Sequence, residues 1–258
     1  MIINSTISLP GDKSISHRSI MLASIASGVS HITNLNDGED LQSTIKAMQS
    51  CGALIKQDKD LIVVTGSSLA NPKEPIDCGN SGTTSRLLTG LLSSQHLSFS
   101  LIGDESLSKR PMNRVIKPLK EMGCIIKSND GLLPLHIDAS NSFNGIDYKM
   151  PIASAQVKSA IILAGLGAKN PSVVKELKHS RNHSEIMLES MGANIVVDDN
   201  NITINPLSSK LKSFNMDIPA DPSSAAFFIA LAALLKGSDL TVKNILLNPT
   251  RTGFIDVL

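Results

Sequence analysis

The sequence predicts an α/β protein, of the α+β kind, built from repeated βαβαββ units. Small residues that start helices recur at regular spacing, at Ser14, Thr83, Ser154 and Ser223. A second series has the same period, because glycines that end amphipathic helices recur at Gly52, Gly123 and Gly192. Two registers with one period indicate an internal repeat of about seventy residues.

The first unit contains all six predicted elements. An alternating strand, Ile2 to Leu9, ends at Pro10 and Gly11, and Asp12 or Ser14 then caps a helix that runs from Lys13 to about Gly28. A strand (30–35), a second helix that stops at Gly52 with Asp37, Glu39 and Asp40 as its caps, and two strands (53–57 and 61–65) follow. This order is βαβαββ, and residues 71–75 read as a linker.

The second and third units repeat this pattern. The second has a short strand (76–78), a helix (81–92), a strand (97–102), a loop, a helix (114–122) and strands after Gly123. The third has helices from Ser154 to Leu166 and from Ser184 to Met191, followed by strands 193–197 and 201–204. The first helix of each pair is rich in small residues, so we expect it to be buried on most sides.

A fourth unit starts but does not continue. A helix opens at Asp221 and runs to Leu235, a strand covers Leu240 to Val242, and the chain ends at Leu258. Half a repeat cannot bury its apolar face. The sequence therefore predicts three complete units plus a fragment of a second domain, with unpartnered apolar residues at Phe227, Phe228, Ile229 and Leu231.

Composition narrows the classes of partner. A net charge of +1, no tryptophan and a single tyrosine argue against a nucleic-acid surface. The longest apolar run, Ala225 to Leu235, is far shorter than the ~20 residues that span a bilayer, and no signal peptide is evident. We expect a cytoplasmic protein with no nucleic-acid or membrane partner.

The cysteines and histidines give little evidence of catalysis. Cys51, Cys78 and Cys124 lack metal-binding spacing, so we expect buried free thiols. His179 and His183 are one helical turn apart in sequence, but no carboxylate completes a zinc motif, and we predict no metal site. We expect His31, His96 and His136 at the surface or at strand edges.

The helix starts carry the polar residues that suit an anion. Unpaired backbone N–H groups and the helix dipole attract phosphate or carboxylate groups. If three units pack about a threefold axis, their first helices direct these N-termini at one place. The residues expected to face it are Lys13, Ser14, Arg18, Asn80, Gly82, Thr83, Arg86, Ser154, Gln156 and Lys158. Two polar loops add Arg110 and Arg181, whose guanidinium groups bind such anions bidentately.

At these residues the chain resembles a known family, the 3-phosphoshikimate 1-carboxyvinyltransferases, or EPSP synthases. The resemblance covers all 258 residues and rests on the motifs at 11–18 (Gly-Asp-Lys-Ser-Ile-Ser-His-Arg), 79–86 (Gly-Asn-Ser-Gly-Thr-Thr-Ser-Arg), 109–111, 154–156 and 248–253, and on Arg181. It implies transfer of the enolpyruvyl group of phosphoenolpyruvate to the 5-hydroxyl of shikimate 3-phosphate, with release of phosphate and without metal or organic cofactor. This reaction belongs to the shikimate pathway of aromatic amino acid biosynthesis.

The resemblance also implies the domain plan. Three βαβαββ units about a pseudo-threefold axis form an inside-out α/β barrel, and two such domains close over the substrates. Residues 11–219 are then an N-terminal domain with units at about 11–70, 71–145 and 146–219. Residues 1–10 and 220–258 belong to a second, incomplete domain, and the full-length protein is expected to be a monomer.

Roles carry over residue by residue. Lys13 is implied as the catalytic lysine shared by both substrates. The contacts to shikimate 3-phosphate are implied at Lys13, Ser14, Arg18, Ser154, Ala155, Gln156 and Arg181, and those to phosphoenolpyruvate at Lys13, Gly82, Arg110 and Gln156. Ser-Ala-Gln at 154–156 is similar to the branch that often tolerates glyphosate, whereas Gly82 replaces an alanine of some tolerant members, so glyphosate sensitivity stays open.

Members of this family are considerably longer than this chain, and their second domain supplies the proton-transfer carboxylates. We therefore expect the 258 residues alone to be inactive or nearly so. Two alternatives remain: a non-catalytic anion-binding half completed by a second polypeptide, and a UDP-N-acetylglucosamine enolpyruvyl transferase. The latter uses a cysteine in the loop that corresponds to Gly103 to Pro111, which contains none here.

Overall fold

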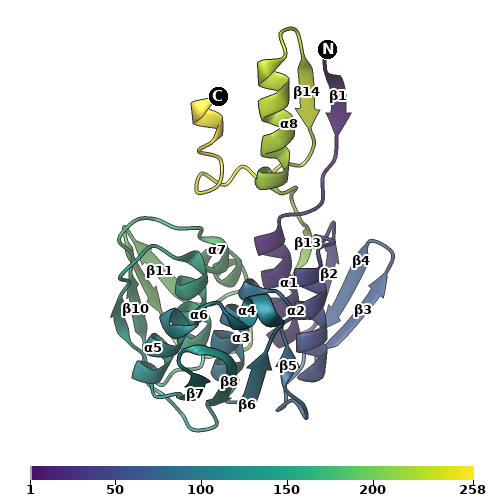
Figure 1. Cartoon of the computed structure of the whole chain (residues 1–258). Coiled ribbons are helices and arrows are strands. Elements are labelled where there is room, and N and C mark those ends of the chain that lie inside the picture. The colour runs from purple at the N-terminus through teal and green to yellow at the C-terminus, as the bar shows by residue number, and fades with distance from the viewer. Residues whose placement is uncertain (1) are drawn as a thin grey trace.

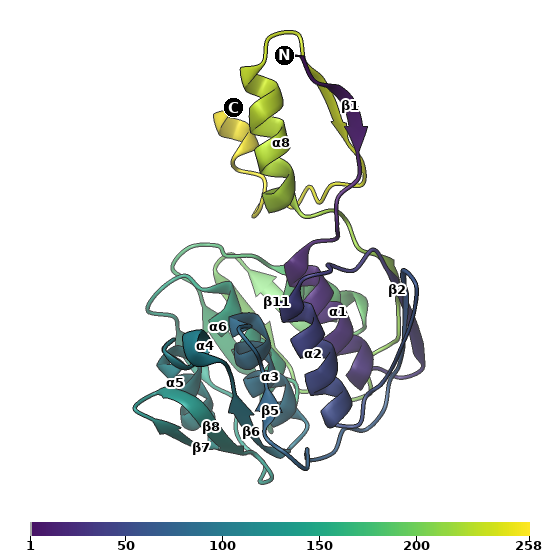
Figure 2. The same cartoon turned by 45° about the vertical axis from the view of Figure 1, so that its right-hand side comes forward.

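The computed structural model describes residues 2–258 and consists of two lobes (Figure 1). The large lobe (residues 11–219) contains three four-stranded sheets arranged around a group of helices. The small lobe (residues 2–9 and 221–258) contains a two-stranded sheet and one long helix. The chain passes between the lobes twice, at Pro10–Gly11 and at Pro219–Ala220, and we call this double passage the crossing (Figure 2).

The three large sheets have the same topology. In each sheet, one edge strand pairs in parallel with its neighbour, and the other neighbouring strands pair antiparallel. The elements of the first sheet and its helices are α1 (Lys13–Ile25), β2 (Val29–Thr33), α2 (Glu39–Ser50), β3 (Leu54–Asp58), β4 (Leu61–Thr65) and β13 (Asn215–Asp217). Those of the second are β5 (Ile76–Asp77), α3 (Gly82–Ser94), β6 (Ser98–Ile102), α4 (Glu105–Ser108), α5 (Asn113–Met122), β7 (Ile125–Asn129) and β8 (Leu132–Asp138).

The third unit completes the series. It contains β9 (Asp147–Lys149), α6 (Ala155–Gly165), β10 (Ser172–Lys175), α7 (His183–Ser190), β11 (Ile195–Asp198) and β12 (Asn201–Ile204). The strand orders β13-β2-β4-β3, β5-β6-β8-β7 and β9-β10-β12-β11 are equivalent. The predicted fold class, three repeated βαβαββ units in a mixed α/β protein, is confirmed.

The first helix of each unit lies in the interior. Nearly every residue of α1 and α3 is buried, and α6 is almost as fully enclosed. Small residues allow this packing, because a Cβ added to Gly90 of α3 would lie 2.1 Å from the carbonyl oxygen of Ala160 in α6. These helices hold the three units together, and their first turns lie on one side of the lobe.

One strand assignment from the sequence is wrong. Periodicity alone puts the segment Ile2 to Leu9 at the start of the first unit, whereas the family resemblance puts residues 1–10 in the second domain. The strand in this segment, β1 (Asn4–Ile7), pairs in parallel with β14 (Asp239–Val242) in the small lobe, so the assignment from periodicity is the wrong one. The first unit instead takes its parallel strand from β13, whose Asn215 pairs with His31. Periodicity identifies a strand but not its partner, and β1 lies beyond the Pro10–Gly11 turn that leads into the small lobe.

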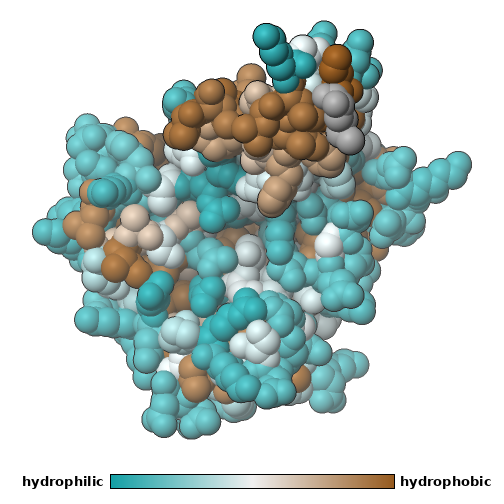
Figure 3. Space-filling view, turned by 45° about the horizontal axis from the view of Figure 1, so that its top comes forward, coloured by the Kyte–Doolittle hydropathy of each residue, from teal (hydrophilic) through white to brown (hydrophobic). Residues whose placement is uncertain are grey.

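The small lobe exposes much of its apolar surface. Its elements are β1, α8 (Pro222–Leu234), β14 and a short 3-10 helix (Ile255–Val257). Phe227 is 80% exposed and Leu234 is 82% exposed, and Phe228 and Leu231 are also exposed. Figure 3 shows the resulting hydrophobic patch over the small lobe, which agrees with the predicted shortage of partners for this helix.

Candidate functional site

Three helix N-termini of the large lobe are capped in the same way. Side-chain oxygens of Asp12, Ser81 and Ser154 accept hydrogen bonds from backbone N–H groups in the first turns of α1, α3 and α6, at 2.9, 3.1 and 3.4 Å. Asp221 caps α8 in the small lobe. Such caps leave other first-turn N–H groups without an intrahelical partner, which favours anions beside them.

A cavity of about 230 Å³ lies beside these N-termini, next to the crossing. Four of its ten lining residues are cations, and three of these are arginines. The lining residues are Lys13, Ser14, Arg18, Thr83, Ala155, Gln156, Arg181, Asp221, Ser223 and Arg251. Four larger hollows, of about 550, 570, 250 and 260 Å³, occur elsewhere in residues 2–258, and none of these four is lined by an arginine. The small cavity is therefore the better candidate for binding an anion.

Arg18 is fixed inside the large lobe. Its Nε donates to Ser184 Oγ (2.8 Å), one Nη donates to the backbone and side-chain oxygens of Ser14 (2.9 and 2.7 Å), and the other Nη donates to Ser159 Oγ (2.6 Å). Burial lowers the pKa of Arg18 to about 10, and the nearby Glu185 carboxylate opposes that shift. The guanidinium is held by three helices, so its position does not depend on a ligand.

Lys13 is the first residue of α1 and remains half exposed. Its ammonium pairs with the carboxylate of Asp40 in the first turn of α2, although the sequence indicated Asp40 only as a helix cap. The backbone N–H of Lys13 donates to Asp221 Oδ2 at 3.2 Å. Lys13 thus has a half-exposed cation at the cavity and a main chain anchored to the small lobe.

A second group of cations adjoins Gln156. Its Oε1 accepts a hydrogen bond from an Arg86 Nη at 2.7 Å, and its Nε2 donates to Thr83 Oγ1 at 3.1 Å. A Cβ on Gly82 would lie 2.9 Å from Arg86 Nη1 and 3.7 Å from Arg110 Nη1, so both guanidinium groups approach this glycine. Burial and the charge of Arg110 lower the pKa of Arg86. The two arginines therefore repel each other at a site that an anion would stabilise.

The predicted site residues divide into three groups. Lys13, Ser14, Arg18, Ala155, Gln156 and Arg181 line the cavity together. Gly82, Arg110 and Ser154 are not among the lining residues: Gly82 and Arg110 lie in the neighbouring arginine group, and Ser154 caps α6. The structure gives their positions and leaves their individual roles as predictions.

The expectation for Lys158 is wrong. Its side chain is 1% exposed and forms ion pairs with Glu176 (2.9 Å) and Glu185 (2.7 Å) instead of facing the common site. Burying this ammonium is possible only because the two carboxylates compensate its charge. Lys158 therefore belongs to the interior between α6, β10 and α7.

Sequence reasoning assigned no role to Arg251, Asp221 or Ser223 at this cavity. Two sequence signals could have pointed to these residues: Arg251 lies in the motif 248–253, and Asp221 and Ser223 start the fourth repeated helix. Their contribution depends on how the small lobe meets the large one, which the repeat does not specify.

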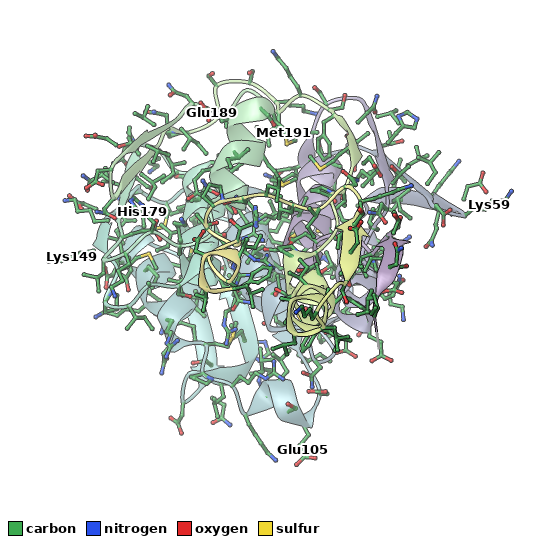
Figure 4. The ribbon with its side chains drawn as sticks, turned by 90° about the horizontal axis from the view of Figure 1, so that it is seen from above. Lys59, Glu105, Lys149, His179, Glu189 and Met191 are labelled. Atoms are coloured by element: carbon green, nitrogen blue, oxygen red, sulfur yellow. The ribbon has the colours of Figure 1, made fainter. Side chains whose placement is uncertain are left out.

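The histidine pair does not come together. His179 is exposed at the outer edge of the third unit (Figure 4), whereas His183 is buried at the start of α7. Across residues 2–258, no group of three or more His, Cys, Asp or Glu side chains is arranged to hold a metal ion. The three cysteines are free and buried, and none of them lines the cavity.

Comparison with known proteins identifies the family. The model of the family "EPSP synthase (3-phosphoshikimate 1-carboxyvinyltransferase)" matches residues 2–258. The chain belongs to the EPSP synthase family. It is 47% identical to a 3-phosphoshikimate 1-carboxyvinyltransferase of Ruthia magnifica subsp. Calyptogena magnifica over 99% of this chain, and 46% identical to that of Caldicellulosiruptor saccharolyticus, also over 99%.

Solved structures of the family have the same fold. The EPSP synthase of Acinetobacter baumannii matches all of this chain with a TM-score of 0.93 and 41% sequence identity. The chain spans about three fifths of its relatives, namely 59% of the Ruthia magnifica protein, 60% of the Caldicellulosiruptor protein and 59% of the Acinetobacter chain. None of the helices in residues 2–258 is long and apolar enough to cross a membrane.

Proposed function

We propose that this protein transfers the enolpyruvyl group of phosphoenolpyruvate to the 5-hydroxyl of shikimate 3-phosphate and releases phosphate. One observation supports this proposal most directly: Lys13, Arg18 and Arg181 line one cavity beside the helix N-termini. The chain that carries this cavity belongs to the EPSP synthase family. A phosphate monoester is a dianion that such a site stabilises by charge, by dipoles and by directed N–H groups.

In this proposal shikimate 3-phosphate occupies the cavity. Arg18, rigidly held by Ser14, Ser159 and Ser184, supplies a fixed positive charge, and Arg181 supplies another from the loop before α7. Ser14, Ser154 and Gln156 add polar side chains at two helix starts, and Ala155 adds its backbone groups. Burial and the charge of Arg251 both lower the pKa of Arg181, so a ligand anion would relieve a repulsion already present in the site.

Phosphoenolpyruvate is assigned to the adjoining arginine group. Gly82 lets a ligand approach the backbone of α3, while the guanidinium groups of Arg110 and Arg86 both approach it. Lys13 is assigned to both substrates, and an incoming anion would draw its ammonium from Asp40. Lys13 is the proposed catalytic residue, as the family resemblance implies.

The partners of the protein are then the two small substrates. The absence of nucleic-acid and membrane partners, a monomeric state at full length and a cytoplasmic location stay predictions. So does the expectation that these 258 residues turn over little without further chain. A phosphate-release assay on this chain, with both substrates present, measures that directly.

The central test is binding of shikimate 3-phosphate to the chain by isothermal titration calorimetry. Wild type is expected to bind, and Lys13→Met is expected to weaken binding about tenfold, because one charge-assisted contact is lost. Lys59→Met, which removes an exposed lysine at the β3–β4 turn, is the matched control. If wild type shows no binding, or if Lys13→Met binds as wild type does, the proposed role of this cavity is wrong.

A further inference from the structure

Arg251 connects the two lobes. One Nη donates to Asp12 Oδ2 in the large lobe at 2.7 Å, and the other donates to Asp221 Oδ1 and Ser223 Oγ in the small lobe at 3.0 and 2.7 Å. The Arg251 side chain is only 10% exposed and Asp12 is fully buried. Since Asp12 caps α1 and Asp221 caps α8, one guanidinium fixes the starts of both helices.

These contacts reinforce the crossing. The backbone N–H of Asp12 donates to Pro219 O (2.8 Å), and that of Asp221 donates to Pro10 O (3.0 Å). The loop that carries Arg251 returns from the small lobe, and its Asn248 side chain donates to Asn182 Oδ1 at 2.8 Å. Asn182 lies next to Arg181 in the sequence. The loop 248–253 thus joins the small lobe to the segment that brings Arg181 to the cavity.

Charge gives Arg251 a second effect. Asp221 lines the cavity together with Lys13, Arg18 and Arg181. The buried carboxylate of Asp12 lies close enough to act on the charges of Arg18 and Arg181, and each of the two carboxylates opposes the binding of an anion. Arg251 forms an ion pair with both of them, at 2.7 and 3.0 Å. Arg251 therefore offsets one of the two negative charges that these helix caps add beside the cavity.

We propose that Arg251 is a positioning residue of the anion cavity, which offsets one of the two negative charges of Asp12 and Asp221 and ties the start of α8 to the start of α1. The class of ligand, a phosphate monoester, rests on the proposed function. The geometry requires a planar group with donors on two sides, because Arg251 reaches both carboxylates at once. A lysine supplies the charge but cannot make the same set of hydrogen bonds.

The test measures binding of shikimate 3-phosphate and of inorganic phosphate to the full chain by calorimetry, together with the thermal midpoint of each variant. Arg251→Gln is expected to weaken both ligands about tenfold, and Arg251→Lys to weaken them less. Lys243→Gln removes one exposed positive charge from the same lobe and is expected to change binding less than about twofold.

A double variant separates charge from simple destabilisation. In Asp221→Asn/Arg251→Gln, one of the two unpaired carboxylates is removed while asparagine still caps the helix, so about half of the logarithmic loss in affinity is expected to return. The inference is overturned if Arg251→Gln binds as wild type does. It is also overturned if its loss of affinity accompanies a lower thermal midpoint and the double variant restores none of it.

The two ligands keep this result distinct from the proposed function. If wild type binds inorganic phosphate but not shikimate 3-phosphate, the proposed substrate is wrong, and the phosphate affinities of the variants still decide the role of Arg251. If wild type binds neither ligand, both proposals are wrong.

Discussion

Two buried histidines have unusual surroundings. His17 Nδ1 is hydrogen-bonded to Thr44 Oγ1 at 2.7 Å, while the Nε2 atoms of His17 and His183 have no partner among the described residues. Burial lowers the pKa of His17 to about 3, against the raising effect of Asp40. Burial, followed by the charge of Arg18, lowers the pKa of His183 to about 3 as well. Both rings are therefore neutral in the folded protein.

These histidines predict a loss of stability in mild acid. An unfolded histidine titrates near its model value of 6.5, so below that pH the unfolded chain binds more protons than the folded chain. Their stabilisation is present above pH 6.5 and falls as the pH decreases toward 3, by about 2 kcal/mol for each histidine at a pH of about 5. Urea unfolding at a pH of about 7.5 and of about 5 measures the difference.

Single variants identify the source of this dependence. His17→Gln is expected to remove about half of the difference between the two pH values, whereas His31→Gln, at an exposed position, is expected to leave it unchanged. An equal pH dependence in wild type and His17→Gln would show that the buried imidazole is not responsible.

Local sequence predicts the position of some site residues and not of others. Lys13 and Arg18 lie close behind a recognisable N-cap, and local sequence places such residues well. Lys158 has the same kind of position in α6, but its partners Glu176 and Glu185 lie much further along the chain, after β10 and in α7. No local pattern indicates that ion cluster.

Packing between α3 and α6 determines how the units meet. Gly90 lies at a close contact between the two helices, since a Cβ there would meet the Ala160 backbone at 2.1 to 2.9 Å. Backbone atoms cannot move aside as a flexible side chain can. The glycine therefore sets the separation of the helices that carry Gly82 and Gln156 at their N-termini.

Gly90→Ala is expected to destabilise the protein by about 1 to 3 kcal/mol, or more, because it overpacks this contact despite the better helix propensity of alanine. Chemical unfolding measures the change in free energy of unfolding. Gly253→Ala is the matched control, since a Cβ at that position meets nothing within 4 Å. Equal stability of the two variants would mean that the α3–α6 contact tolerates a methyl group.

The positions of the helices and hairpins could be predicted closely from the sequence, but the pairing of strands that are distant in the chain could not. The helices were located within a few residues because caps and glycines mark their ends. The short helix α4, in the loop expected at Gly103 to Pro111, is a single turn with too few apolar positions to give a period. The three-residue strand β13 pairs with β2, which comes from near the start of the chain, and periodicity carries no information about so distant a partner.

Exposed apolar side chains are concentrated on the small lobe, which carries nine of the eighteen large hydrophobic residues that are exposed among residues 2–258. α8 is apolar on all sides, yet among its residues only Pro222 and Ala225 are buried. An apolar helix usually lies inside a core. Its exposed apolar side chains form a surface to which we expect a hydrophobic dye to bind in the native state.

Native chain is expected to increase the fluorescence of 8-anilinonaphthalene-1-sulfonate, and Phe227→Ser/Leu234→Ser is expected to reduce that signal without lowering the thermal midpoint. Ile125→Ser/Val197→Ser, which removes exposed residues from two separate sheets, serves as the control. The attribution to α8 fails if both double variants reduce the fluorescence equally.

The pairing of β1 with β14 affects how the protein is made. On the ribosome, Asn4 emerges long before its partner Asp239, and β2 waits as an edge strand until β13 has been translated. The second and third units take all their strands from contiguous sequence, so they can fold during synthesis. The sheet of the first unit, which carries Lys13, is completed late in translation. Until then the exposed edge of β2 can pair with a wrong strand and needs protection.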